Sequence, residues 1–265
     1  MPYETLRLDV QDGVAHVTLT EAGRGNPIDG AFCHEMNELS LELVDGVTKG
    51  VVRAVLIDAE GKVFSYGGDV SVFAKAGDDL PGLILRWTSD LHMAIARLQR
   101  MDAPIVTAVH GVCAGGMAAF VAGSDVLVGA DDALFVAAYT GIGYSCDASA
   151  SVTLSRRMGL ARARRYLLLD EKLDAQTALQ AGLLDEVVPR DELAARAAKL
   201  AGRLAKGPTR AYGEIRRLLL SAEDQPLESQ LELEAQALSR MAGAADSREG
   251  LTAFAERRKP VFTGR

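Results

Sequence analysis

Apolar and polar side chains alternate at the start of the chain, most clearly over residues 14–19, which follow a turn at Asp12-Gly13. This period of two predicts a strand that pairs in an opening hairpin. After the loop that ends at Pro27, apolar side chains recur every three or four residues, which predicts an amphipathic helix capped by Asp29. Those apolar positions are Phe32, Met36, Leu39, Leu43 and Val47.

Short apolar runs then alternate with helical periods. Strands are expected at residues 52–57, 105–109, 126–128 and 134–136, and helices at residues 83–101 and from Gly115 onward. The glycine-rich segment 61–68 indicates a loop, and residues 76–82 predict a mobile loop because they are polar and interrupted by glycine and proline. Strands that alternate with helices after a hairpin are typical of an α/β core with parallel pairing.

The pattern changes towards the C-terminus. From Ala148 onward helical periods dominate, interrupted only by a strand-like run at residues 184–188, and the tail from Asp191 is predicted to be helical throughout. Its expected breaks are Gly207-Pro208, Gln225-Pro226 and Gly243. We therefore expect a core over residues 1–190 and a C-terminal helical region over residues 191–265.

Composition and charge narrow the classes of partner. The chain has 265 residues, 48% of them hydrophobic, which is enough to build a full core. The formal charge of −7 and the scattered basic residues argue against a nucleic-acid partner. No stretch approaches the roughly 18 uninterrupted apolar residues of a membrane span. We expect a soluble protein with no membrane partner.

Cysteine usage and ligand spacing narrow the picture further. Cys33, Cys113 and Cys146 form no CxxC pair, and the first residues show no secretory pattern, so a reducing cytoplasm is expected. No His/Cys/Asp cluster has metal-ligand spacing, and the phosphate-binding and dinucleotide-binding glycine motifs are absent. Neither a metal nor a hydride-transfer cofactor is expected.

Two glycine-bearing turns are the candidate functional elements of the sequence. Residues 63–69 follow one predicted strand, and residues 110–117 follow the next and open a helix. Glycine lets a backbone approach a ligand closely, and amides at a helix start point outward with partial positive charge. Backbone N–H groups placed in this way can hold an oxyanion. Glycines alone are equally compatible with two tight turns of an α/β protein.

The motifs around these turns resemble those of the crotonase (enoyl-CoA hydratase/isomerase) superfamily. The run Phe64-Ser65-Tyr66-Gly67-Gly68-Asp69 resembles the pattern F-C-A-G-x-D, and residues 110–116 resemble N-G-x-x-x-G-G. Residues 26–28, 175–183 and 250–262 resemble further segments of the family, so that nearly the whole chain is covered.

The resemblance implies a fold, a substrate class and an assembly. The fold would be the α/β crotonase (ClpP-like) spiral of ββα units with a C-terminal all-helical trimerisation region, assembled as a homotrimer or a dimer of trimers. The substrate would be an acyl-CoA thioester, with coenzyme A as part of the substrate and no separate cofactor. The N–H groups of Gly68 and Gly116 would form an oxyanion hole for the thioester oxygen.

The acid and base residues depart from the hydratase pattern. Counting without gaps from Gly116, the two hydratase glutamates fall at Ala119 and Tyr139. Adding water to a double bond needs one group that activates the water and another that protonates carbon. Alanine is no base and an unactivated phenol is a poor one near neutral pH, so the sequence argues against ordinary hydratase activity.

Asp147 is the remaining carboxylate at a position that resembles a catalytic one in the family. It resembles the aspartate of dienoyl-CoA isomerases, of epoxyphenylacetyl-CoA isomerases and of 4-chlorobenzoyl-CoA dehalogenases. One carboxylate beside an oxyanion hole suffices for a double-bond shift, because it can remove and return the same proton. Asp147 could instead cap the helix that follows. Burial would raise its pKa and nearby amides would lower it, and the sequence leaves the direction open.

His92 makes a second reaction class, hydrolysis or dehalogenation of an aromatic acyl-CoA, an alternative. It falls at the position of the water-activating histidine of the dehalogenase group, in which the aspartate is the nucleophile, whereas Tyr139 replaces that group's tryptophan. An isomerase with Asp147 as proton carrier, and with Tyr139 and His92 shaping the pocket, is the first hypothesis. An aromatic acyl-CoA dehalogenase or hydrolase and a non-catalytic crotonase-fold protein are the alternatives.

Four residues are expected to bind coenzyme A. Arg24 resembles a phosphate-contacting position, and Tyr66 lies in the first glycine turn. Phe254 and Arg257 fall where the family's terminal helix reaches the adenine end of a neighbouring subunit's ligand. As an alternative, the basic cluster at Arg257 could be a solvated helix end.

Overall fold

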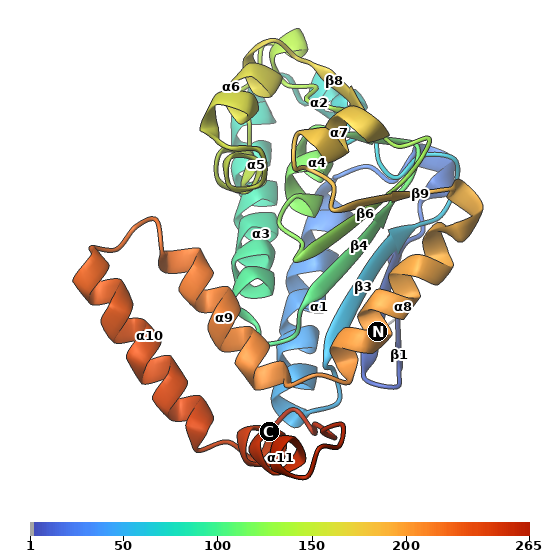
Figure 1. Cartoon of the computed structure of the whole chain (residues 1–265). Helices are drawn as coiled ribbons and strands as arrows, with labels where there is room; N and C mark the ends of the chain where they lie inside the picture. The colour runs from blue at the N-terminus through green and yellow to red at the C-terminus, as the bar shows by residue number, and fades with distance from the viewer. Residues whose placement is uncertain (1–2) are drawn as a thin grey trace.

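The main sheet carries the site at one end of its strands. The computed structural model describes residues 3–265, and its larger sheet has the strand order β1-β2-β3-β4-β6-β9 (Figure 1). β1 pairs with β2 in an antiparallel hairpin, and every following pair in this sheet is parallel, as the sequence predicts. The strands are β1 (Leu6–Gln11), β2 (Val14–Leu19), β3 (Ala54–Ala59), β4 (Ile105–Val109), β6 (Val126–Ala130) and β9 (Glu186–Val188).

Helices cover both faces of this sheet. α1 (Gly30–Lys49) and α3 (Leu80–Arg100) pack together on one face, and α1 begins at the predicted cap, where the Asp29 carboxylate accepts the Phe32 N–H. α8 (Leu193–Ala205) covers the other face through a row of buried small side chains, so the first helix beyond residue 190 packs against the core. β4 is buried along its whole length, and its sequence is accordingly apolar at every position except Thr107.

A second, smaller sheet holds the glycine turns. β5 (Val112–Ala114) pairs in parallel with β7 (Leu134–Val136), which pairs in antiparallel with β8 (Lys172–Asp174). The sequence did not predict β5 or β8, and the expectation of a single strand after Ala148 was wrong. Strands of three residues are too short to show a period of two, and β8 exposes both of its terminal side chains.

The prediction of a mobile loop at residues 76–82 was also wrong. α2 (Val70–Ala76) runs into a short 3₁₀ turn at Gly77–Asp79, and α3 starts at Leu80. Pro81 lies in the first turn of α3, where a missing N–H costs nothing because first-turn amides have no helical acceptor. Proline here marks a helix start.

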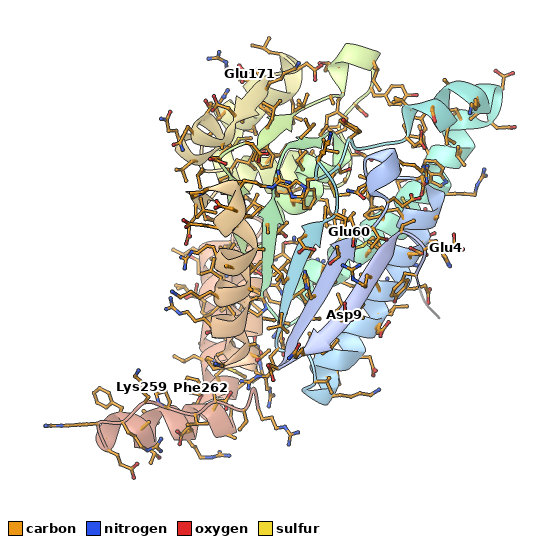
Figure 2. All side chains as sticks on the ribbon, turned by 90° about the vertical axis from the view of Figure 1, so that its right-hand side faces the viewer. Glu4, Asp9, Glu60, Glu171, Lys259 and Phe262 are labelled. Atoms are coloured by element: carbon orange, nitrogen blue, oxygen red, sulfur yellow. The ribbon has the colours of Figure 1, made fainter. Side chains whose placement is uncertain are left out.

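The remaining helices divide between the site and the tail. α4 (Gly116–Val121) and α7 (Ala175–Gln180) contact the smaller sheet, and α5 (Ala150–Met158) packs against α4 and α6 (Leu160–Leu168). α9 (Thr209–Ser221), α10 (Leu227–Ala242) and α11 (Ala245–Ala255) lead away from the sheet, as predicted for a helical tail (Figure 1). Figure 2 shows Lys259 and Phe262 on the terminal segment, in the lower part of the molecule in this view. None of the helices within residues 3–265 is both long and apolar enough to cross a membrane.

Candidate active site

The two glycine turns lie side by side and are joined through their backbones. Ser65 N–H donates to the Val112 carbonyl at 3.0 Å, and Ala114 N–H donates to the Ser65 carbonyl at 3.0 Å. Gly67 has a φ of 82°, and a Cβ placed there would lie 2.6 Å from the Ala114 carbonyl oxygen. Glycine is therefore required at position 67 both by its backbone angle and by the close approach of the second turn.

The amides of Gly68 and Gly116 are the expected oxyanion donors. Gly116 is the first residue of α4, so its N–H has no acceptor within the helix. Within residues 3–265, neither N–H donates to a backbone acceptor in the turns and loops. Two N–H groups without acceptors, on turns that are bonded to each other, can serve a negatively charged oxygen.

Asp147 lies directly beside this second turn. A Cβ built on Gly116 would be 3.2 Å from Asp147 Oδ1 and 3.2 Å from Ile28 Cδ1. The buried Tyr139 hydroxyl donates to Asp147 Oδ1 at 3.2 Å. Residues from three distant parts of the chain thus place one carboxylate oxygen next to Gly116, one of the two expected oxyanion donors.

Burial controls the charge of this carboxylate. Burial raises the pKa of Asp147 above its usual range, while the Tyr139 hydrogen bond and the nearby His92 act in the opposite direction and are outweighed. This resolves the direction that the sequence left open. Burial and the adjacent Asp147 charge also raise the pKa of the Tyr139 phenol, so Tyr139 stays protonated and acts as a hydrogen-bond donor.

Asp147 does not cap the following helix with its side chain. α5 begins at Ala150, its N-cap residue is Ser149, and no side chain provides a cap hydrogen bond there. Ala148 and Ser149 have positive φ values of 49° and 71°, which L-residues rarely adopt. Backbone strain of this kind persists when the surrounding structure fixes it, and it accumulates at functional sites.

His92 contacts the same segment from α3. Its Nε2 accepts the N–H of Ala148 at 3.3 Å, so in this arrangement the lone pair of Nε2 faces a backbone amide. His92 is exposed to solvent. The structure therefore brings Gly68, Gly116, Asp147, Tyr139 and His92 together, but His92 contacts the backbone beside the carboxylate.

A cavity of about 650 Å³ opens next to Asp147 and Tyr139. Its wall is largely apolar and aromatic, and Phe73 stacks against Tyr144 with ring centroids 5.9 Å apart. Sequence analysis missed several wall residues, namely Phe73, Leu80, Ile84 and Leu91. The helical spacing of Ile84, Trp87 and Leu91 was the available signal, because it places them on one face of α3.

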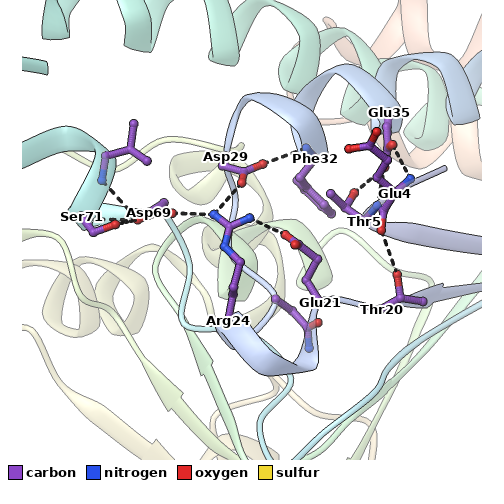
Figure 3. A network of polar contacts seen from close by, with 12 residues as sticks. Glu4, Thr5, Thr20, Glu21, Arg24, Asp29, Phe32, Glu35, Asp69 and Ser71 are labelled. Carbon is purple, nitrogen blue, oxygen red and sulfur yellow. Dashed lines mark hydrogen bonds and ion pairs between the residues drawn. The ribbon is translucent and has the colours of Figure 1, made fainter. Parts of the chain in front are cut away.

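The residues expected to bind coenzyme A are dispersed in one chain. Arg24 lies near the first glycine turn and is paired with carboxylates (Figure 3). The Tyr66 ring is exposed and covers Gly25, where a Cβ would lie 2.3 Å from the ring. Phe254 and Arg257 are exposed on and after α11, at the end of the molecule opposite to α2 (Figure 1). Within one chain, these last two residues do not reach the cavity.

Comparison with known proteins identifies the family. The family model described as "Enoyl-CoA hydratase/isomerase" matches residues 9–265. The chain is 34% identical to the 1,2-epoxyphenylacetyl-CoA isomerase of Escherichia coli, with 97% of each chain covered. It is 32% identical to a Rhodobacter capsulatus protein named "Probable enoyl-CoA hydratase", with both chains fully covered.

The structure agrees with these matches. A crystal structure of a Mycobacterium abscessus protein assigned to enoyl-CoA hydratase/isomerase superposes with a TM-score of 0.90 at 33% identity, covering 98% of this chain and 100% of the other. The predicted α/β crotonase fold with a helical C-terminal region is confirmed. This chain belongs to the enoyl-CoA hydratase/isomerase family of the crotonase superfamily.

Proposed function

We propose that the protein is an enoyl-CoA isomerase in which Asp147 moves a proton between two carbons of the bound acyl group. The observation that carries this proposal is the position of Asp147 Oδ1, 3.2 Å from the point where a Cβ of Gly116 would lie. When the thioester oxygen accepts hydrogen bonds from the Gly68 and Gly116 N–H groups, the neighbouring carbons of the acyl group would lie within reach of Asp147 Oδ1.

The reaction needs one base and one anion-binding site. Ionised Asp147 removes a proton from one carbon, and the electron pair moves into a dienolate whose negative oxygen accepts the two backbone N–H groups. The protonated carboxyl then returns the proton to the other end of the dienolate, which shifts the double bond. A raised pKa suits this exchange, because it makes Asp147 a stronger base than an exposed aspartate.

The missing glutamates support an isomerase over a hydratase. Ala119 is fully buried in α4 and supplies no titratable group. Tyr139 cannot replace the second glutamate as a base, since burial raises the pKa of its phenol. Tyr139 instead orients Asp147 through its hydrogen bond.

The geometry gives less support to aryl-ester hydrolysis. In that reaction Asp147 would form an ester with the substrate, and His92 would activate the water that cleaves it. A water base needs a free nitrogen lone pair, but His92 Nε2 already faces the Ala148 N–H. To activate water through Nδ1 instead, His92 would need the water and the ester to lie on the other side of its ring.

Oligomerisation and coenzyme A binding are part of the proposal. Large apolar side chains are exposed along α10 and α11, including Leu238, Leu251 and Phe254. Burying them in a homotrimer, or in a dimer of trimers, would remove this surface from water and bring Phe254 and Arg257 to a neighbouring subunit's coenzyme A.

Proton exchange in D₂O tests the reaction. NMR would follow the α and γ positions of a 3-enoyl-CoA and of a cyclic acyl-CoA, with the wild type and Asp147→Asn. We expect exchange and double-bond migration to fall by at least about 100-fold in Asp147→Asn, since the general base is removed. Asp78→Asn is the matched control, because Asp78 also lines the cavity and lies on another element. Full activity of Asp147→Asn would contradict the proposal.

A further inference from the structure

We propose that Arg24 is a positioning residue for the oxyanion hole, which holds the Gly68 amide in place through Asp69. This inference rests on the proposed function of Gly68. It assigns to Arg24 a role within its own chain in place of the expected contact with a coenzyme A phosphate.

The Arg24 guanidinium joins the starts of two helices. Its Nη2 lies 2.8 Å from Asp29 Oδ2 and 2.7 Å from Asp69 Oδ2, and its Nη1 lies 2.7 Å from Glu21 Oε2 (Figure 3). Asp29 caps α1, and Asp69 caps α2 by accepting the N–H groups of Ser71 and Val72. Arg24 therefore fixes the start of α2 relative to the start of α1.

Asp69 transmits this restraint to the oxyanion hole because it directly follows Gly68. The Ile28 N–H donates to the Gly67 carbonyl at 2.8 Å, and the Asp69 N–H donates to the Ile28 carbonyl at 3.1 Å. These two bonds hold the peptide groups on either side of Gly68 against residue 28. The ion pair between Arg24 and the Asp69 side chain restrains the same segment. The backbone hydrogen bonds and this ion pair together determine the direction of the Gly68 N–H.

The charges around Arg24 disfavour a phosphate contact. Glu21, Asp29 and Asp69 carry three negative charges around one guanidinium, so an approaching phosphate would meet a net negative group. The hydrogen bonds of these carboxylates raise the pKa of Arg24, led by that of Asp29, and they keep the guanidinium charged. Nη1 and Nη2 each already donate a hydrogen bond to a carboxylate, that of Glu21 and that of Asp69.

Loss of the guanidinium would leave two carboxylates facing each other. The side chains of Asp29 and Asp69 are only 11% and 13% exposed, and both contact the same nitrogen of Arg24. Without the cation they would repel, and the α2 start with Gly68 would shift. A donor displaced from the developing oxyanion lowers the rate of the chemical step more than it weakens substrate binding.

The test measures Arg24→Met with an acyl-CoA and with the corresponding acyl-pantetheine thioester, which lacks the nucleotide phosphates. We expect kcat to fall about 10- to 100-fold with little change in KM, and by the same factor for both thioesters. Arg196→Met is the matched control, since Arg196 also makes a two-bond pair with a carboxylate, that of Glu186, but lies on α8. A loss confined to KM and seen only with the coenzyme A substrate would identify a phosphate ligand and overturn the proposal.

Two further variants separate positioning from general destabilisation. Arg24→Met combined with Asp69→Asn should recover part of the lost kcat, because the repulsion is removed while an amide oxygen can still cap α2. Arg24→Lys should be intermediate, since one ammonium group retains the charge but not the forked geometry. A double variant no more active than Arg24→Met would count against the proposal.

Amide hydrogen exchange provides a readout that needs no reaction. Peptides that cover residues 63–73 should exchange faster in Arg24→Met and Arg24→Lys than in the wild type, while peptides from β4 should not change. Unchanged exchange over residues 63–73 would overturn the positioning role even if the substrate class were wrong. Faster exchange in a protein without isomerase activity would support the positioning role and reject the proposed function alone.

Discussion

Two half-buried aspartates behave in opposite ways in this molecule. In the pocket, Asp147 accepts a hydrogen bond from the neutral Tyr139, and burial raises its pKa. On β3, burial acts in the same direction on Asp58, but the hydrogen bond with His16 and the polar surroundings outweigh it and lower its pKa. His16 Nε2 lies 2.8 Å from Asp58 Oδ2. The partner, rather than burial alone, decides whether a buried carboxylate becomes a base or a structural anion.

The largest expected effect comes from filling the space between Asp147 and the proposed oxyanion hole. In Gly116→Ala the new methyl group would lie 3.2 Å from both Asp147 Oδ1 and Ile28 Cδ1. We expect kcat to fall by about 10²- to 10³-fold, as when one oxyanion donor is lost. Gly202→Ala is the control, because a Cβ there has no neighbour within 4 Å. Equal kinetics for the two variants would show that the Gly116 amide takes no part in the reaction.

The second prediction tests the comparison of the aspartates directly. At pH 6, Asp147→Asn should raise the free energy of unfolding by about 0.5–1 kcal/mol, because it removes a charge that burial disfavours. Asp58→Asn should lower it by about 1–2 kcal/mol, because it weakens a hydrogen-bonded charge pair. Denaturant unfolding monitored by circular dichroism measures both values. Changes of the same sign would contradict the contrast between the two sites.

The pH dependence of these effects follows from the pKa directions. The pKa of His16 is raised, chiefly by its hydrogen bond to Asp58. The contribution of His16 to the free energy of unfolding is therefore complete below about pH 6.5, and it is lost as the pH rises through the folded-state pKa. Because the pKa of Asp58 is lowered, the contribution of Asp58 to the free energy of unfolding is present above about pH 4 and is lost on further acidification. The Asp58→Asn penalty should therefore be greatest between these limits. Since His16 is 39% exposed, solvent screening keeps the His16 part at or below about 1 kcal/mol.

The smallest effect is expected for Tyr139→Phe. The Tyr139 hydrogen bond lowers the pKa of Asp147, so its removal should raise that pKa further and move the acidic limb of the kcat/KM profile to higher pH. The control is Tyr144→Phe, which also alters a phenol in the cavity wall. A limb that stays in place, or moves equally in both variants, would show that Tyr139 does not tune Asp147.

Local patterns predicted most of the fold. The apolar period of α1 and the cap at Asp29 are properties of neighbouring residues, and both are confirmed. The short strands β5 and β8 escaped prediction because their pairing partners, not their own sequence, make them strands. Pro81 was taken as a loop residue, since the sequence alone does not separate a proline in a loop from one in a first helical turn.

The site was less predictable than the fold. The resemblance made Gly68, Gly116 and Asp147 candidates, but the proximity of Asp147 to Gly116 arises only in the folded chain. The partners of Arg24 include Asp69, which is 45 residues away in sequence, and no local pattern links the two. The direction of the Asp147 pKa likewise depends on how many atoms surround the carboxylate, which is a property of tertiary packing.

The left-handed backbone at Ala148 and Ser149 also governs how the enzyme can change under selection. A single Ala148→Gly exchange would relieve roughly 1 kcal/mol of backbone strain, which makes it an accessible step toward a more stable protein. It would also loosen the peptide that directly follows Asp147. With Asp147 as the proposed proton carrier, stability and turnover would make opposite demands on residue 148.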